Sequence, residues 1–358
     1  MILSNNYKAF LSLVRLGIGH SASVLPDEFE WPAVQTIALQ HGLSAVVLDG
    51  VEKMPDNKRP PKNVTLQWIG EVLHSYEQRY EQYKRAIAEL AGFYNAHGHR
   101  MMVLKGYACS LYWPKPEHRP CGDIDIWVFG EQKYADALLI DKKNIEVDYS
   151  HHHHTVFYWK GFMVENHYDF LNVHHHKSNV ELEAILKELG QDDSHYVELN
   201  GEIVYLPSPN LHAIFLLRHA MSNFSSTGML LRQLLDWGFF VEKHGREVDW
   251  EWIKKTLGWF GMKPLFQIFN AICVGDLGFD VSLFPTIQFD PSLKDRVLND
   301  ILSPEFSEIE KGGFISRVIY KYRRWKANAW KHELCFNESM SSAFWSGVKS
   351  HLLKPSSI

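Results

Sequence analysis

The chain has 358 residues, of which 46% are hydrophobic and 22% charged, a composition typical of a globular protein with two or three domains. Thirty-seven Lys and Arg against 42 Asp and Glu give a net charge of −5, so no overall positive field attracts nucleic acid. Four scattered cysteines without a CxxC pair, no basic leader before an apolar stretch, and no run of about 18 apolar residues argue against secretion and membrane insertion, so we expect a cytoplasmic protein.

Residues 1–98 are predicted to form an N-terminal helical region. Apolar residues recur at spacings of three and four in YKAFLSLVRLG and WPAVQTIALQHGLSAVVLDGV. After the loop MPDNKRPPKN, Asn63 is a suitable N-cap for a long helix that continues to about His97.

This long helix, residues 64–97, carries apolar side chains at alternating spacings of four and three. The seam consists of Ile69, Leu73, Tyr76, Tyr80, Tyr83, Ile87, Leu90 and Tyr94. A seam of this kind fits either a coiled-coil contact in a dimer or a single long helix packed on its own domain.

Residues 99–206 show the alternation of strands in RMMVLKG, DIDIWV, HHTVFYW and FMVENHYDF. Lys160-Gly161 has the spacing of a hairpin turn, and YACSLYW is typical of a short helix. From 207 to 358 helical periodicity returns after LPSPN. The predicted fold class is therefore α+β, with a small mixed sheet at 99–206 flanked by helical regions at 1–98 and 207–358.

Two aspartates interrupt the apolar strand RPCGDIDIWV, residues 119–128. Side chains two apart in a strand share a face, so Asp123 and Asp125 project together while Ile124 and Ile126 point into the core. Carboxylates among apolar neighbours need a cation or several donors, and a pair of them suits Mg²⁺. Acids at this spacing occur elsewhere in the chain, so a capped or salt-bridged pair is the alternative interpretation.

The strand FMVENHYDF supplies a third acid. Period two predicts Glu165, His167 and Asp169 on one face and Val164 and Tyr168 on the other. Three carboxylates on two strands suit two Mg²⁺ ions, or Mn²⁺ in their place.

Several stretches resemble nucleotidyltransferase family 5, a group of bacterial proteins within the DNA polymerase β-like nucleotidyltransferase superfamily. They are VLKGYACSLYW, RPCGDIDIWV, VENHYDF, LPSPNLHAIFLLRHA, LLRQLLDW and WPAVQTIALQHGLSAVVLDGV, which together span about residues 30 to 245. The resemblance implies a polymerase β-like core and an enzyme that transfers a nucleoside monophosphate from an NTP to an acceptor hydroxyl, with release of pyrophosphate. The superfamily often carries Gly-Gly or Gly-Ser before the aspartates, whereas this chain has Lys105-Gly106-Tyr107.

The resemblance also implies roles for individual residues. Asp123 and Asp125 would bind both metals, and Glu165 would bind the metal that activates the acceptor hydroxyl. Glu165 is preferred over Asp169 because the family pattern places the acid two residues before a histidine, here His167.

The phosphates of the nucleotide need cations as well. Lys105, on the turn with Gly106, and Arg119 are the candidates for contacts to the β- and γ-phosphates, although each could instead be salt-bridged. His167 is a candidate for orienting the acceptor or a nearby carboxylate. The resemblance places His219, Arg232 and Asp236 over the nucleotide cleft, where Arg232 and Asp236 also have the spacing of an i,i+4 ion pair.

Two further features invite other interpretations. Histidines 151–154 and 174–176 suit either a zinc or nickel site or exposed strand ends. Basic and aromatic residues alternate in RVIYKYRRWKANAWKH, residues 317–332, which fits either binding to single-stranded nucleic acid or an anionic surface, or a helix with its aromatics turned inward.

The leading hypothesis is thus a Mg²⁺-dependent nucleotidyltransferase. Its acceptor could be a small molecule, a glycan intermediate or a protein. A catalytically silent nucleotide-binding or interaction protein of the same fold is the second hypothesis, and a histidine-metal hydrolase, which requires the histidine clusters to converge, is the third.

Overall fold

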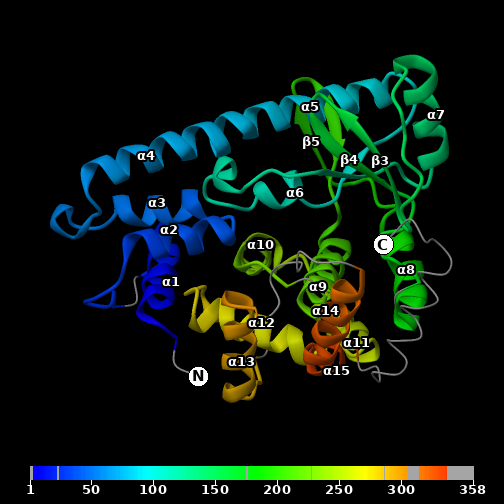
Figure 1. The fold of residues 1–358 in the computed structure, drawn as a ribbon. Helices are drawn as coiled ribbons and strands as arrows, with labels where there is room; N and C mark the ends of the chain where they lie inside the picture. The colour runs from blue at the N-terminus through cyan, green and yellow to red at the C-terminus, as the bar shows by residue number, and fades with distance from the viewer. Residues whose placement is uncertain are drawn as a thin grey trace.

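A computed structural model describes residues 3–21, 24–174, 176–226, 228–285, 287–304 and 314–336. Within these residues, helices flank a single six-stranded sheet (Figure 1), so the predicted α+β class is confirmed. No helix among them combines the length and the apolar composition that a membrane crossing needs.

The N-terminal region is helical, as predicted. Its helices are α1 (Asn5–Gly17), α2 (Trp31–Gln40), α3 (Ser44–Glu52), α4 (Lys62–Val72) and α5 (Arg79–Asn95), and a π-helical segment, Leu73–Gln78, joins the last two into one long helix. This helix begins at Lys62 after Pro61, so Asn63 lies inside its first turn and is not the N-cap.

The apolar seam of the long helix faces the chain itself over most of its length. All six seam residues from Tyr76 to Tyr94 are buried, whereas Ile69 and Leu73 are 41% and 47% exposed. The helix therefore packs on its own core from Tyr76 onward, and only its first two seam positions are open to a second chain. A dimer through this helix stays a prediction.

The sheet has the strand order β3-β4-β2-β1-β6-β5. The strands are β1 (Met102–Val103), β2 (Ile124–Trp127), β3 (His154–Trp159), β4 (Phe162–His167), β5 (Tyr196–Leu199) and β6 (Glu202–Tyr205). β2 runs parallel to β4 and β1 parallel to β6, while the other neighbours are antiparallel, so the sheet is mixed.

Two hairpins close the ends of the sheet. Lys160-Gly161 joins β3 to β4, as predicted, and Asn200-Gly201 joins β5 to β6, which was not predicted. All four residues have positive φ, which is the conformation of a type I′ turn and matches the twist of the strands. The Asn-Gly pair between alternating runs is the signal that predicts the second hairpin.

Opposite faces of the sheet contribute to two different hydrophobic cores. Ile124, Ile126 and Val164 pack with α5 and α7 (Gln132–Lys143) on one face. Trp127 and Phe170 pack on the other face with α8 (Lys177–Leu189) and the C-terminal helices. Because side chains alternate along a strand, Asp125 points to the face of Trp127, toward the C-terminal helices.

The C-terminal region is helical, as predicted. It contains α9 (Pro209–Ser225), α10 (Leu231–His244), α11 (Trp250–Trp259), α12 (Lys263–Gly275), α13 (Pro291–Leu302), α14 (Phe314–Ala327) and α15 (Ala329–Phe336), and α6 (Tyr107–Ser110) is the predicted short helix of the middle region. Apolar side chains of α1 and α3 share one continuous core with those of α9, α10 and α12.

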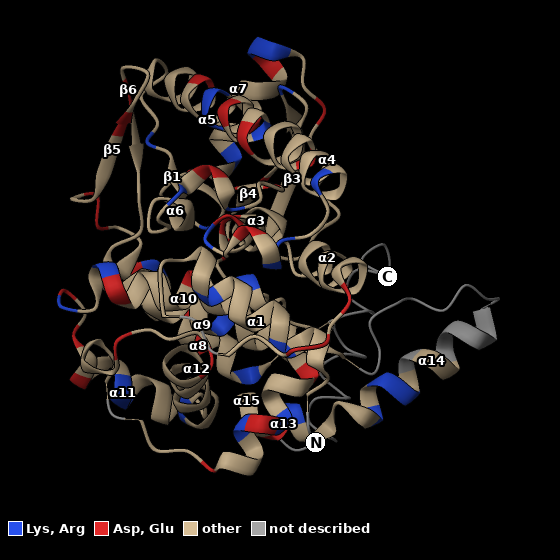
Figure 2. Cartoon of the chain, turned by 90° about the vertical axis from the view of Figure 1, so that its left-hand side faces the viewer, with Lys and Arg blue, Asp and Glu red and all other residues tan. Residues whose placement is uncertain are grey.

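The basic-aromatic segment 317–332 is divided between surface and interior. Trp330 stacks under the Arg296 guanidinium, 3.9 Å from its ring centroid, and Lys331 is buried in an ion pair with Asp300 at 2.6 Å. Tyr322, Arg323 and Lys326 are exposed on α14, which lies at the edge of the molecule in Figure 2. The side chains of Arg317 and Lys321 lie outside the described residues, and nucleic-acid binding by the segment stays a prediction.

Candidate active site

The candidate site lies where β2 and β4 run side by side. Their parallel register pairs Asp125 with Glu165 and Trp127 with His167. Nε2 of His167 lies 3.1 Å from Oδ1 of Asp125 and 3.6 Å from Oε2 of Glu165. Asp125, Glu165 and His167 thus offer ligand atoms within 4.8 Å of one another, a group that could hold a metal ion.

The turn after β1 brings a cation to the same carboxylate. The Leu104 N–H donates to the Asp125 carbonyl at 3.0 Å, which holds the end of β1 against β2. The next residue, Lys105, places Nζ 2.7 Å from Oδ1 of Asp125. Lys105 therefore reaches the aspartate pair, where the sequence predicted a phosphate contact.

Gly106 is needed at this turn for a steric reason. Its φ is +51°, and an added Cβ would lie 2.3 Å from the hydroxyl oxygen of Tyr83. That hydroxyl donates to the Asp123 carbonyl at 2.7 Å, so α5 supports the aspartate loop through the space that a side chain at 106 would fill. The glycine keeps this contact open.

The charges of the site are strongly coupled. Burial alone would raise the pKa of Asp125, but Lys105 and His167 more than offset it and hold that pKa well below its usual range. The negative charge of Asp125, together with burial, raises the pKa of Asp123.

The two cations are shifted in the opposite sense. Burial would lower the pKa of His167, yet hydrogen bonds to Asp125 and Glu165 raise it to about 9. Burial would likewise lower the pKa of Lys105, but the charge of Asp125 raises it. The positive charges of Lys105 and His167 therefore lie beside the carboxylates of Asp123, Asp125 and Glu165 and are stabilised by them.

Asp169 is held away from this group. β4 ends at His167, so the strand alternation from which the face of Asp169 was predicted does not extend to this residue. The Asp169 carboxylate pairs instead with Lys187 of α8, and its backbone carbonyl accepts from Nδ1 of His167 at 3.1 Å. Glu165 is the acid that lies beside Asp125.

A cleft of about 240 Å³ opens beside Asp123 and Asp125. Its walls come from the β1–α6 turn, the loop before β2, α9 and α10. The lining includes Lys105, Gly106, Cys109, Arg119, Asp123, Asp125, His219, Asn223, Arg232, Gln233 and Asp236. The residues that the resemblance placed over the cleft, His219, Arg232 and Asp236, do line it.

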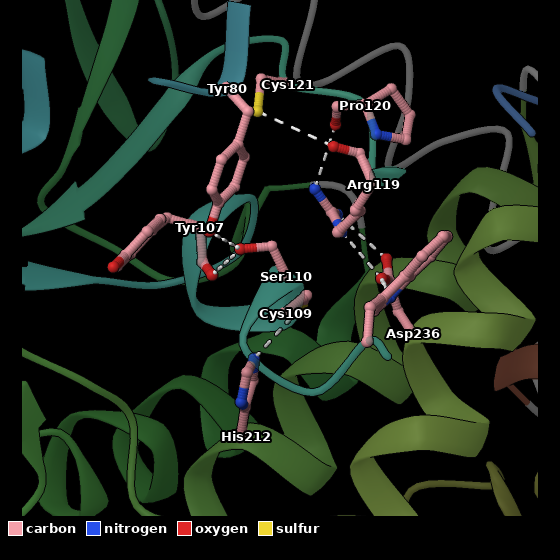
Figure 3. Close-up of polar contacts among 10 residues, drawn as sticks. Tyr80, Tyr107, Cys109, Ser110, Arg119, Pro120, Cys121, His212 and Asp236 are labelled. Carbon is pink, nitrogen blue, oxygen red and sulfur yellow. Dashed lines mark hydrogen bonds and ion pairs between the residues drawn. The ribbon is translucent and has the colours of Figure 1, made fainter. Parts of the chain in front are cut away.

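Arg119 is tied into the wall of this cleft (Figure 3). Its Nε and Nη2 donate to the two carboxylate oxygens of Asp236 at 2.8 and 3.0 Å, and Nε1 of Trp113 donates to the same carboxylate at 2.9 Å. Nη1 donates to the Pro120 carbonyl at 3.3 Å. The side chain thus connects the loop before β2 to α10. The i,i+4 spacing suggested Arg232 as the partner of Asp236, but the partner is Arg119.

Arg232 lies in the cleft without such a partner. Among the described residues it forms no ion pair, and burial followed by the charge of Arg119 lowers its pKa. A guanidinium in this position is short of negative charge, so an anionic group in the cleft would be stabilised there. The i,i+4 ion pair with Asp236 that the sequence suggested for Arg232 does not form.

Helix α6 is anchored to α9 below the cleft. Sγ of Cys109 lies 3.7 Å from Nε2 of His212 (Figure 3). The Tyr112 hydroxyl lies 2.8 Å from Nδ1 of the same ring. Burial raises the pKa of Cys109, which keeps the thiol protonated. The Cys109–His212 contact therefore joins the two walls and does not form a nucleophilic pair.

The site combines an in-register carboxylate pair on two neighbouring strands with an adjacent cleft that is lined by Lys105, Arg119 and Arg232. Such donors belong to the class of sites that suit a divalent cation and an anionic substrate. Comparison with known proteins narrows this class. A family model described as an uncharacterised nucleotidyltransferase matches residues 27–270. The match covers more than half of the chain, so the chain belongs to this family, and the expected resemblance is confirmed. No curated protein and no solved structure matches the chain.

Proposed function

We propose that the chain is a Mg²⁺-dependent enzyme that transfers a nucleoside monophosphate from an NTP to an acceptor hydroxyl. Family membership supports nucleotidyl transfer and a nucleotide substrate. The observation that carries the proposal is the in-register pair Asp125–Glu165, with Asp123 and Lys105 beside it at the mouth of a cleft.

The donor set fits Mg²⁺. Hard cations take carboxylate oxygens, and Asp125 and Glu165 supply them close together. Asp123 is near enough for the negative charges of Asp125 and Glu165 to raise its pKa. When bound there, the metal would lower the pKa of the acceptor hydroxyl and neutralise charge on the triphosphate. Mn²⁺ prefers similar ligands.

The cationic side chains of the cleft would have different roles in the transfer. In transfer, the acceptor oxygen forms a bond to the α-phosphorus, the bond to the β-phosphate oxygen breaks, and pyrophosphate leaves. Arg232 and Lys105 would stabilise the charge that develops on the departing pyrophosphate. Arg119, held by Asp236, would position the wall that carries Asp123 rather than contact the phosphates itself.

The cleft volume limits what can be enclosed. About 240 Å³ is smaller than the roughly 300–1,000 Å³ typical of small-molecule pockets. Part of an NTP would therefore extend beyond the cleft. The acceptor could be a small molecule, a glycan intermediate or a protein.

A specific observation keeps a second function open. Oδ1 of Asp125 is contacted by both Lys105 and His167, so two protein cations already neutralise the carboxylate that a metal would use. A catalytically silent protein that binds nucleotide without metal would have this arrangement.

Thermal unfolding with ATP, GTP, CTP and UTP, each with and without Mg²⁺, separates the two functions. A ligand at 100 times its dissociation constant adds about 2.7 kcal/mol, which should raise the midpoint by several degrees. We expect a Mg²⁺-dependent rise that Asp125→Asn abolishes, while Asp141→Asn, an exposed acid on α7, retains it. A rise that is independent of Mg²⁺ would favour the silent binder, and no rise with any nucleotide would contradict both functions.

A further inference from the structure

Histidines from two strands meet beside the carboxylate pair. β3 and β4 are antiparallel, and their register places His154 directly opposite His167. His153 precedes β3, and its backbone carbonyl accepts from the N–H groups of Tyr168 and Asp169, both at 3.1 Å. The ring of His153 lies 4.4 Å from that of His154 and 5.5 Å from that of His167, centroid to centroid. The hairpin thus brings three imidazoles together.

The ligand atoms of these residues have nearly the spacing of a metal site. His153, His154 and His167 each offer a ring nitrogen within 4.8 Å of the others. Oε2 of Glu165 lies 3.8 Å from Nδ1 of His154 and 3.6 Å from Nε2 of His167. Ligands around a tetrahedral zinc ion, with bonds of about 2.1 Å, are about 3.4 Å apart, so small rotations of the side chains would close the site.

The surroundings of His154 are the strongest indication of a bound metal. This residue is 7% exposed, and both of its ring nitrogens are buried without a hydrogen-bond partner among the described residues. A buried polar group without a partner costs free energy, and a bound cation would remove that cost.

His167 is already oriented as ligating histidines are. Its Nδ1 donates to the Asp169 carbonyl, which directs Nε2 toward Asp125 and Glu165, and a metal bound there would take the place of the Nε2 proton. A second hydrogen bond of this kind usually fixes the tautomer and the ring of a metal ligand. Imidazole nitrogens favour zinc and similar transition metals, whereas Mg²⁺ prefers oxygen.

We propose that His153, His154 and His167, with Glu165 as the fourth ligand, bind one divalent transition-metal ion of the zinc class. The site lies next to the proposed magnesium site and shares Glu165 with it, but it does not depend on the proposed function. Its metal would fix the orientation of Glu165 beside Asp125. Of the second histidine run, the ring of His174 approaches His152 and His176 stacks on Phe336, while His175 lies outside the described residues.

Metal content and affinity test this site. Full-length chain without a purification tag is stripped with a chelator, reloaded with Zn²⁺ and measured by elemental analysis and chelator competition, and Co²⁺ loading reports the coordination geometry. We expect one zinc per chain and an absorption spectrum of tetrahedral Co²⁺. His154→Gln should weaken Zn²⁺ binding by at least tenfold, and His153→Gln provides a second variant if the first does not fold.

Two controls make the outcome decisive. His174→Gln removes an exposed histidine of the other run and should leave zinc affinity unchanged. Asp125→Asn removes the proposed magnesium site but should keep the zinc, so loss of nucleotide binding with retained zinc separates the two proposals. Binding of less than one zinc at micromolar concentration, or equal affinity in His154→Gln and His174→Gln, would overturn the assignment.

Discussion

The Arg119–Asp236 pair allows a sharp test of what Arg119 does. Both side chains are buried, at 7% and 5% exposure, and three donors converge on the Asp236 carboxylate. Asp236→Asn keeps the shape but removes the charge and places an amide N–H₂ against a guanidinium N–H₂. Removing one partner of a buried ion pair costs about 3–5 kcal/mol because the other charge stays buried and unpaired.

Urea unfolding followed by circular dichroism measures this loss. The matched control is Asp193→Asn in the Arg100–Asp193 pair, whose side chains are 44% and 50% exposed and whose loss should cost no more than about 1 kcal/mol. Replacing both partners, as Arg119→Met with Asp236→Leu, should recover most of the stability.

The same variants distinguish a structural Arg119 from a phosphate-binding one. If Arg119 mainly held the cleft wall, Arg119→Met would lower stability by several kcal/mol, whereas Arg232→Met would lower nucleotide affinity with little effect on stability. A loss below about 1 kcal/mol in Asp236→Asn would refute the reasoning, since it would mean that the guanidinium finds other partners or water.

Two further predictions concern the stability of the protein. Gly106→Ala should lower the free energy of unfolding by about 1–3 kcal/mol, because the residue has positive φ and the added Cβ would meet the Tyr83 hydroxyl. Urea unfolding should show a smaller loss in a Tyr83→Phe background, which removes that hydroxyl. Equal losses in both backgrounds would contradict the steric cause. Burial lowers the pKa of His41 to about 4, so the unfolded chain binds more protons between pH 6.5 and 4, and stability should fall on acidification by about 3 kcal/mol across that range. In His41→Asn this part of the pH dependence should disappear, and an unchanged slope between pH 6.5 and 4 would rule out His41 as its source.

Local patterns predicted the strands and the hairpin on which the candidate site lies. The alternation in DIDIWV predicted that Asp125 lies on the face opposite to Ile124 and Ile126. The Lys160-Gly161 pair predicted the turn of the hairpin that carries Glu165. Both inferences depend on geometry within a few residues, which the sequence contains directly.

Two inferences from local rules lack support in the structure. Period two was applied to Asp169, but β4 ends at His167. The i,i+4 rule paired Asp236 with Arg232, but a buried guanidinium from 117 positions earlier in the chain takes that carboxylate. Arg119 donates to both oxygens of Asp236, and a bidentate pair of this kind is stronger than a single i,i+4 contact.

The sequence by itself determined the α+β class, the family and the candidate acids of the site, because each follows from residue types and short spacings. Only the tertiary structure decided that β2 lies parallel to β4, which sets Glu165 beside Asp125, and that β3 brings His154 opposite His167. Strand neighbours and buried ion pairs join residues far apart in the chain. Their choice depends on packing the whole core, which no local pattern records.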